Sequence, residues 1–254
     1  MIKENRTSKY LLYAIGEIVL VVIGILIALQ INNWNEKKNQ NALVNTYLKN
    51  FVEDLKNDAE SFKLTKNDQV FKFHSLQYLL TLINEKPVNS RPNETVDPLT
   101  SENTIWSKPI PKEFDRDLVE LAFLWSARAG NPKLNKTSIE ELKSTGSFSL
   151  IENIDLKNAI NYYYATIEWR LGETNMAYSL RIRNNWQEEL IKDGVLAQDI
   201  SNVENPIGLI KGDLKRIGNI RAIIRATWFK FNSANILEQL ATELIELIEA
   251  EISK

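Results

Sequence analysis

The chain lacks cysteine altogether and contains a single histidine, His74. The absence of cysteine excludes disulfide bonds, thiolate metal ligands and a thiol nucleophile. One histidine excludes metal sites and proton relays that need several imidazoles within one chain. No His-Glu-x-x-His pattern, EF-hand loop or phosphate-binding glycine loop occurs in the sequence. We therefore predict no enzyme, no catalytic or metal-binding residues and no cofactor.

Strong charge of one sign is also missing. The 254 residues hold 31 Lys and Arg against 33 Asp and Glu, for a net charge of -2, which argues against a nucleic-acid partner. Apolar residues make up 44% and charged residues 25%, as in ordinary folded proteins. The length predicts one or two domains.

The main positive signal is an apolar run over residues 10–31, in which Glu17 carries the only formal charge. As a helix, the run would be about 33 Å long, enough to cross a hydrocarbon core of roughly 30 Å. Tyr10, Tyr13 and Trp34 lie where interfacial aromatic residues are expected. A cleaved signal peptide and a buried soluble helix are the alternatives, but the run is longer than a signal peptide's apolar region and lacks a polar face. We predict an uncleaved anchor in a lipid bilayer.

The orientation of the anchor rests on weak charge signals. Basic residues flank the run almost equally on its two sides: Lys3, Arg6 and Lys9 before it, and Lys37, Lys38 and Lys49 after it. A short tail is easily retained in the cytoplasm, whereas long downstream domains translocate largely regardless of charge. We expect residues 1–9 in the cytoplasm and residues 35–254 on the far side of the membrane, with the reverse topology as the alternative.

One stripe of the apolar run carries both its small residues and its carboxyl group. Ala14, Glu17, Val21, Gly24 and Ala28 recur at steps of three and four, which places them on one helix face. Small residues four apart let two helix backbones approach closely. The stripe predicts self-association or docking on another membrane protein. The alternative for Glu17 is a carboxyl that snorkels to the headgroups or is protonated in place.

The residues from Lys9 to Glu36 resemble the N-terminal anchor of a family of uncharacterised single-span proteins from flavobacteria and related Gram-negative bacteria. The stretch from Ser138 to Ile151, followed by Tyr162 and Tyr163, is similar to the downstream domain of that family. The resemblance implies an inner-membrane anchor and a helical domain, and it implies no activity.

Helical periodicity dominates the rest of the chain, so the fold class is predicted as all-α, a transmembrane helix followed by a helical bundle. Five of the seven prolines fall in residues 85–113, which predicts a long loop. Trp106 is either exposed there or pins the loop to the core. Further helices are expected over residues 39–83 and 114–129. A short helix should begin at a capping box formed by Ser138 and Glu141 and end near Gly146. Another should run from a cap at Asp155 to Gly194, with Gly172 in its middle, and the last should cover residues 213–252.

Two further groups of residues are candidates for binding. Arg221, Arg225 and Trp228 lie on neighbouring turns and could bind an anion or an acidic partner, or else pair within the molecule. Three consecutive tyrosines, residues 162–164, together with Trp169, could line a pocket, although at 100° steps one tyrosine should face outward. His74 is expected to be a packed or capping residue.

These signals favour a membrane-anchored helical interaction or accessory module. The alternative is a small-molecule-binding, sensor-like domain that signals through a membrane partner, with a pocket lined by Tyr164, Trp169 or Trp228.

Overall fold

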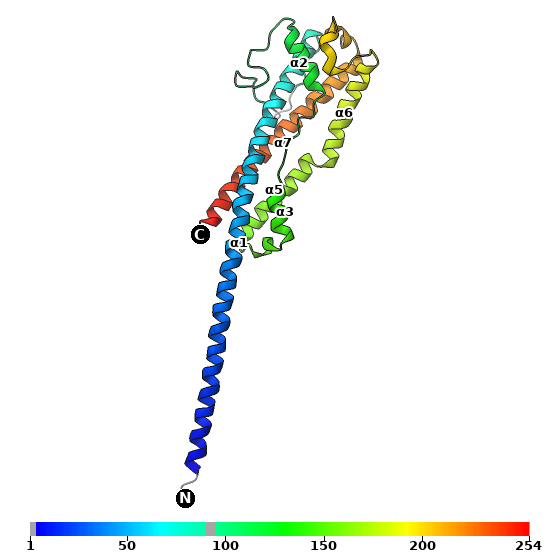
Figure 1. The fold of residues 1–254 in the computed structure, drawn as a ribbon. Helices are drawn as coiled ribbons and strands as arrows, with labels where there is room; N and C mark the ends of the chain where they lie inside the picture. The colour runs from blue at the N-terminus through cyan, green and yellow to red at the C-terminus, as the bar shows by residue number, and fades with distance from the viewer. Residues whose placement is uncertain (1–3, 90–94, 254) are drawn as a thin grey trace.

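The computed structural model describes residues 4–89 and 95–253, with side chains from residue 10 onward. It confirms an all-α fold in which a long N-terminal helix continues into a helical bundle (Figure 1). The helices, in chain order, are α1 (Glu4–Leu82), α2 (Arg116–Ser126), α3 (Thr137–Ser144), α4 (Ser147–Leu150), α5 (Ile154–Leu171), α6 (Glu173–Ile191), the 3₁₀ helices η1 (Ala197–Asn202) and η2 (Pro206–Leu209), and α7 (Leu214–Ile252).

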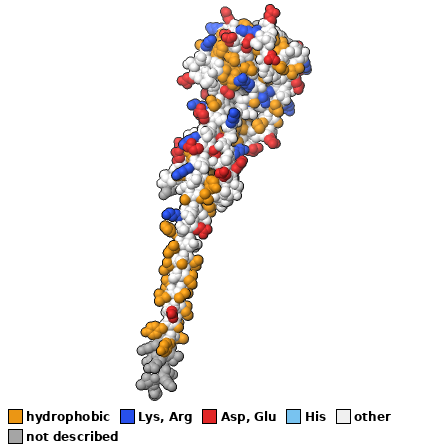
Figure 2. All heavy atoms as spheres, viewed as in Figure 1, with side chains coloured by type: hydrophobic (Ala, Val, Ile, Leu, Met, Phe, Trp, Pro, Cys, Tyr) orange, Lys and Arg blue, Asp and Glu red, His pale blue; other side chains and the backbone are white. Residues whose placement is uncertain are grey.

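Helix α1 is a single uninterrupted helix of 79 residues, about 120 Å long. The apolar run and the helix expected over residues 39–83 therefore form one continuous helix, with no turn in the Asn-rich stretch between them. The chain contains neither glycine nor proline between Ile25 and Lys86, so nothing breaks the hydrogen-bond ladder where the side chains change from apolar to polar. In Figure 2 the N-terminal part of α1 projects from the body with mainly hydrophobic side chains on its surface.

The body is organised around α1 and α7, which lie side by side in opposite directions (Figure 1). Ion pairs such as Lys56–Glu249 and Lys66–Glu238 fix this antiparallel register. Two apolar cores follow one another along the pair. The basal core, near the projecting helix, includes Phe51 and packs α3, α4 and α5 against α1 and α7. The distal core includes Trp186 and packs α2, α6 and the 3₁₀ helices against the same pair.

The described parts of the proline-rich segment, residues 85–89 and 95–113, are held against the distal core. Trp106 is 6% exposed, and its backbone N–H donates to the Asn103 side chain at 3.1 Å, so this tryptophan pins the segment rather than projecting from it. Ile110 packs partly against the same core. His74 is 2.8 Å from the backbone oxygen of Asp97 through Nε2 and stacks edge-on to Phe73, a structural role as expected.

Three expected helix boundaries differ in the structure. The capping box at Ser138 is wrong, because Lys136 is the N-cap of α3 and Ser138 lies inside the helix. The cap of α5 is Asn153, whose side chain accepts from Leu156 N–H at 3.1 Å, rather than Asp155. At Gly172 the helix is interrupted completely, since this residue is extended and separates α5 from α6. A methyl group at Gly172 would lie only 2.1 Å from the carbonyl oxygen of Glu168, so the tight junction requires glycine.

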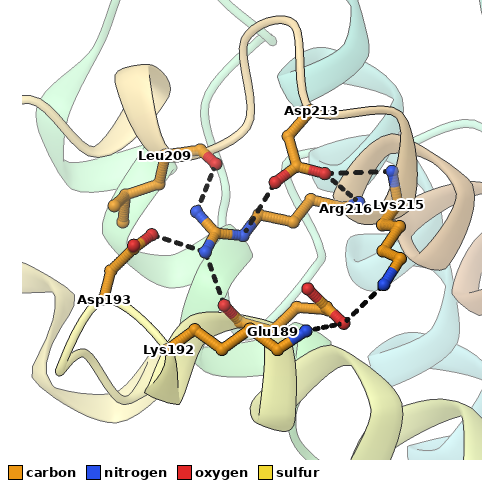
Figure 3. Close-up of polar contacts among 7 residues, drawn as sticks. All are labelled: Glu189, Lys192, Asp193, Leu209, Asp213, Lys215 and Arg216. Carbon is orange, nitrogen blue, oxygen red and sulfur yellow. Dashed lines mark hydrogen bonds and ion pairs between the residues drawn. The ribbon is translucent and has the colours of Figure 1, made fainter.

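A buried arginine joins the elements at the distal end of the body (Figure 3). The Arg216 guanidinium donates to the carbonyl oxygens of Leu209, at 2.7 Å, and Glu189. It also forms ion pairs with Asp193 and Asp213, and Asp213 in turn caps the first turn of α7. The arginine is 5% exposed, so these partners replace the water that it loses on folding.

We expect the Arg216→Leu substitution to lower the free energy of unfolding by about 3 kcal/mol, because it removes one side of a buried ion-pair network. Thermal melting of the full chain in mild detergent, followed by circular dichroism, should show this as a lowered melting temperature. Lys215→Leu is the matched control, since the Lys215 side chain is 75% exposed and pairs only peripherally with Glu189. Equal melting temperatures for the two variants would contradict the role given to Arg216.

Candidate functional site

The largest group of buried polar side chains forms a stripe along the inner face of α1. The stripe consists of buried Asp54, Asp58, Gln69 and Lys72 and of half-buried Ser61, at helical steps of three, four and eight. Every member bonds a residue between Arg128 and Ser138, where the chain passes from α2 to α3. The crossing segment, residues 127–136, is therefore fastened to α1 at several points.

At the basal end of the stripe, two carboxylates hold the start of α3. The Asp58 carboxylate accepts from the Asn135 backbone N–H at 2.9 Å and from the Tyr163 hydroxyl at 2.9 Å. The Asp54 carboxylate accepts from the Asn135 side-chain amide at 2.6 Å and from Ser138 N–H at 3.0 Å. Asp54 on α1 thus satisfies an N–H of the first turn of α3, because the N-cap, Lys136, makes no side-chain hydrogen bond there.

At the upper end, cations meet backbone carbonyl oxygens. Lys72 donates to Arg128 O at 2.8 Å, and Arg183 lies 3.5 Å from Ala127 O. Lys230, on α7, donates to Ala129 O and to the Asn131 side chain at 2.7 Å. The backbone carbonyl groups of the crossing segment thus substitute for carboxylate partners. This layer lies between the two apolar cores.

Burial shifts the titration of these groups towards neutral pH. Desolvation raises the pKa of the Asp58 carboxyl to about 6. Its hydrogen bonds to Asn135 and Tyr163 act in the opposite direction and lower the pKa, but by less. Desolvation and the nearby positive charges of Lys230 and Arg183 lower the pKa of Lys72 to about 7. Desolvation likewise lowers the pKa of Lys230 to about 8.

Chemically, this arrangement orders the crossing segment rather than presenting reactive groups. Asp58 is 1% exposed and Lys72 is 5% exposed, so neither faces a substrate. Among the residues that the structure describes, no group of three or more potential ligands could hold a metal ion. The sequence analysis missed this stripe. Its signal is visible in retrospect, because polar residues at helical spacing interrupt the buried face of an otherwise amphipathic helix.

A hollow of about 360 Å³ opens beside the crossing segment, at the break between α5 and α6. Leu134 and Lys136 line one side, and Ile167, Gly172 and Met176 line the other. The aromatic residues predicted for a pocket are not part of its lining.

The predicted tyrosine cluster divides between core and surface. Tyr163 is buried and Tyr162 is 62% exposed, so one tyrosine faces outward as expected. Tyr164 is half-buried and stacks on Phe51, while Trp169 is 66% exposed on the outer face of α5. The four aromatic residues therefore do not converge on one cavity.

The predicted basic patch is partly paired within the molecule. Arg221 donates to Glu85 at 3.0 Å and to the carbonyl oxygen of Lys86 at 3.0 Å. Arg221 and Arg225 both line a shallow hollow of about 490 Å³ next to the segment 86–89, but Trp228 is not among its lining residues. The two arginines therefore share a hollow to which Trp228 does not contribute.

The predicted membrane-helix stripe lies on the projecting part of α1, where every side chain from residue 10 to residue 38 is exposed. Its direction relative to the body follows from the continuity of the helix. At about 100° per residue, Gly24 lies on the side of α1 that carries exposed Glu53, roughly opposite to buried Leu48 and Leu55. The stripe of Ala14, Glu17, Val21, Gly24 and Ala28 therefore faces away from the body.

These observations define an all-α protein whose long apolar N-terminal helix becomes the central helix of a bundle. One helix is long and apolar enough to cross a membrane, as a signal sequence near an N-terminus would also be. A family model described as a family of unknown function (DUF6090) matches residues 17–88, which are part of the apolar run and the remainder of α1. No curated protein and no solved structure matches the chain. The match does not reach Ser138–Ile151, so the resemblance stated for that stretch stays a prediction.

The raised pKa of Asp58 predicts a specific dependence of stability on pH. Because its folded-state pKa lies above the ordinary value of 3.8, its contribution is fully present below pH 3.8 and is lost as the pH rises through about 6. The expected loss is about 3 kcal/mol, from a shift of roughly two units. Melting curves of the wild type and of Asp58→Asn between pH 4 and pH 7 should diverge accordingly, whereas parallel pH profiles would contradict the assignment.

Proposed function

We propose that this chain is a single-span, membrane-anchored helical module that presents its body to partner proteins on the periplasmic side of a bacterial inner membrane. The observation that carries the proposal is the continuity of α1. The helix that is apolar over residues 10–31 supplies Leu48, Phe51 and Leu55 to the basal core and Phe71 to the distal core. A cleavable leader has no reason to be continuous with the central helix of the folded domain.

The continuity of α1 also determines on which side of the helix a partner could bind. A rigid α1 holds the body upright, because no turn separates the apolar run from the bundle. The stripe with Gly24 and Ala28 faces away from the body, so a second copy or another membrane helix could pack there without meeting the bundle. This geometry supports self-association or docking in the membrane as the means of contact.

The outer face of α5 offers a contact surface outside the membrane. Tyr162 and Trp169 are 62% and 66% exposed, and their spacing of seven residues places them on one side of the helix. Exposed tryptophan and tyrosine residues are typical of the centres of protein interfaces. This face favours an interaction module.

The second candidate function is small-molecule binding with signalling through a membrane partner. The hollow between the crossing segment and the α5–α6 break supports this function, because a ligand bound there would contact the junction between the two helices. The lining mixes charged Lys136, Glu168 and Glu173 with apolar Ile167 and Leu171, which would suit an amphipathic ligand.

The anchor and its orientation can be tested together, because the native chain has no cysteine. We expect the full chain to stay in the membrane pellet after alkaline carbonate extraction. A single cysteine at Lys63 should react with a membrane-impermeant maleimide in intact spheroplasts, whereas one at Ser8 should react only after permeabilisation. A soluble protein, or a mature protein that lacks its first thirty residues, would refute the anchor, and inverted labelling would reverse the topology.

Contact through the stripe can be tested by disulfide crosslinking in native membranes. We expect single cysteines at Val21 and Gly24 to form crosslinked species several-fold more efficiently than cysteines at Ile18 and Val22, since only the first pair lies on the stripe. Equal efficiency at all four positions would argue against a defined interface on this face.

A further inference from the structure

The basal end of the body lies unusually close to the apolar run of α1. The Lys37 ammonium pairs with the Glu152 carboxylate at 2.9 Å, and Glu152 belongs to the corner between α4 and α5. A shallow hollow between the two elements is lined by Asn33 and Lys37 of α1 and by Ser149, Leu150 and Glu152 of the corner. The corner therefore approaches α1 only a few residues beyond Ile31.

The rise of an α-helix gives the distance of the Lys37–Glu152 pair from the end of the apolar run. Lys37 follows Ile31 by six residues, which corresponds to a rise of about 9 Å. Each headgroup layer of a bilayer is about 5–8 Å thick beyond the hydrocarbon core. If α1 spans the membrane, the carboxylate that pairs with Lys37 lies at the outer edge of the headgroup layer.

The corner carries an exposed apolar side chain at this level. Ile154 is 69% exposed and is the first residue of α5, directly after the Asn153 cap. Helix α5 runs away from the apolar run, since its beginning lies near Lys37 and Tyr163 bonds Asp58. Side chains of a helix tilt towards its N-terminus, so Ile154 leans back towards the membrane plane.

The corner is held firmly in this position. The Asn153 side-chain amide donates to the Glu251 carboxylate at 2.8 Å, which ties the cap of α5 to the end of α7. Lys157 donates to the carbonyl oxygen of Ser149 at 3.0 Å, which closes the corner on itself. Ile151 is buried in the basal core.

We propose that the α4–α5 corner, residues 149–154, is a second membrane contact that rests on the lipid headgroups, with Ile154 inserted among them. The inference rests on the proposed anchor, because only a spanning α1 brings the corner to the bilayer. Two points of attachment, the span and the corner, would fix the rotation of the body about α1. The outer face of α5 would then rise directly from the lipid surface.

The test uses the full chain in phosphatidylethanolamine–phosphatidylglycerol vesicles, with a fluorophore on one introduced cysteine. Ile154→Cys reports the corner. Leu214→Cys is the matched control, because Leu214 is also the first residue of a long helix and is 82% exposed, but at the distal end. Leu20→Cys reports the span. The quenchers are lipids that carry a spin label on the headgroup or on the acyl chain.

We expect headgroup-labelled lipid to quench the label at residue 154 severalfold more strongly than the label at residue 214, and acyl-labelled lipid to quench the label at residue 20. Equal quenching at residues 154 and 214, with residue 20 still quenched, would overturn the corner contact and leave the anchor intact. If the label at residue 20 is not quenched by either lipid, the anchor fails, and the corner contact fails with it.

Discussion

The structure depends on one constraint: the helix that is apolar at its N-terminal end must also serve as the central helix of the bundle. Helix α1 contributes to both apolar cores and pairs with α7 along most of its polar length. Because no glycine or proline interrupts it between Ile25 and Lys86, the two roles are coupled mechanically. A rotation or tilt of the apolar end would be transmitted directly to the packing of the body.

The buried polar stripe on α1 fastens the crossing segment to the bundle. Side chains from Asp54 to Lys72 bind residues between Arg128 and Ser138, and they satisfy backbone groups that would otherwise be buried without partners. Burial moves the pKa values of Asp58 and Lys72 towards neutral pH. The end of the stripe at Lys72 lies where the basal core gives way to the distal core.

The proposals differ in how directly the geometry supports them. The direction of the Gly24 stripe follows from helix periodicity along an unbroken α1 and therefore applies to any partner helix. The corner contact follows from the Lys37–Glu152 pair and the short rise from Ile31. The hollow at the α5–α6 break is built from mixed polar and apolar residues, which favours an amphipathic ligand if the second function holds.

The sequence by itself determined the all-α class, the apolar run and the long proline-rich loop, because hydrophobic periodicity and proline act locally. It also indicated that one of three consecutive tyrosines must face outward. Only the tertiary structure decided that Asp54 of α1 binds the first turn of α3 and that Arg221 pairs with Glu85. These features join residues far apart in the chain, and the periodicity of a single segment carries no information about such partners.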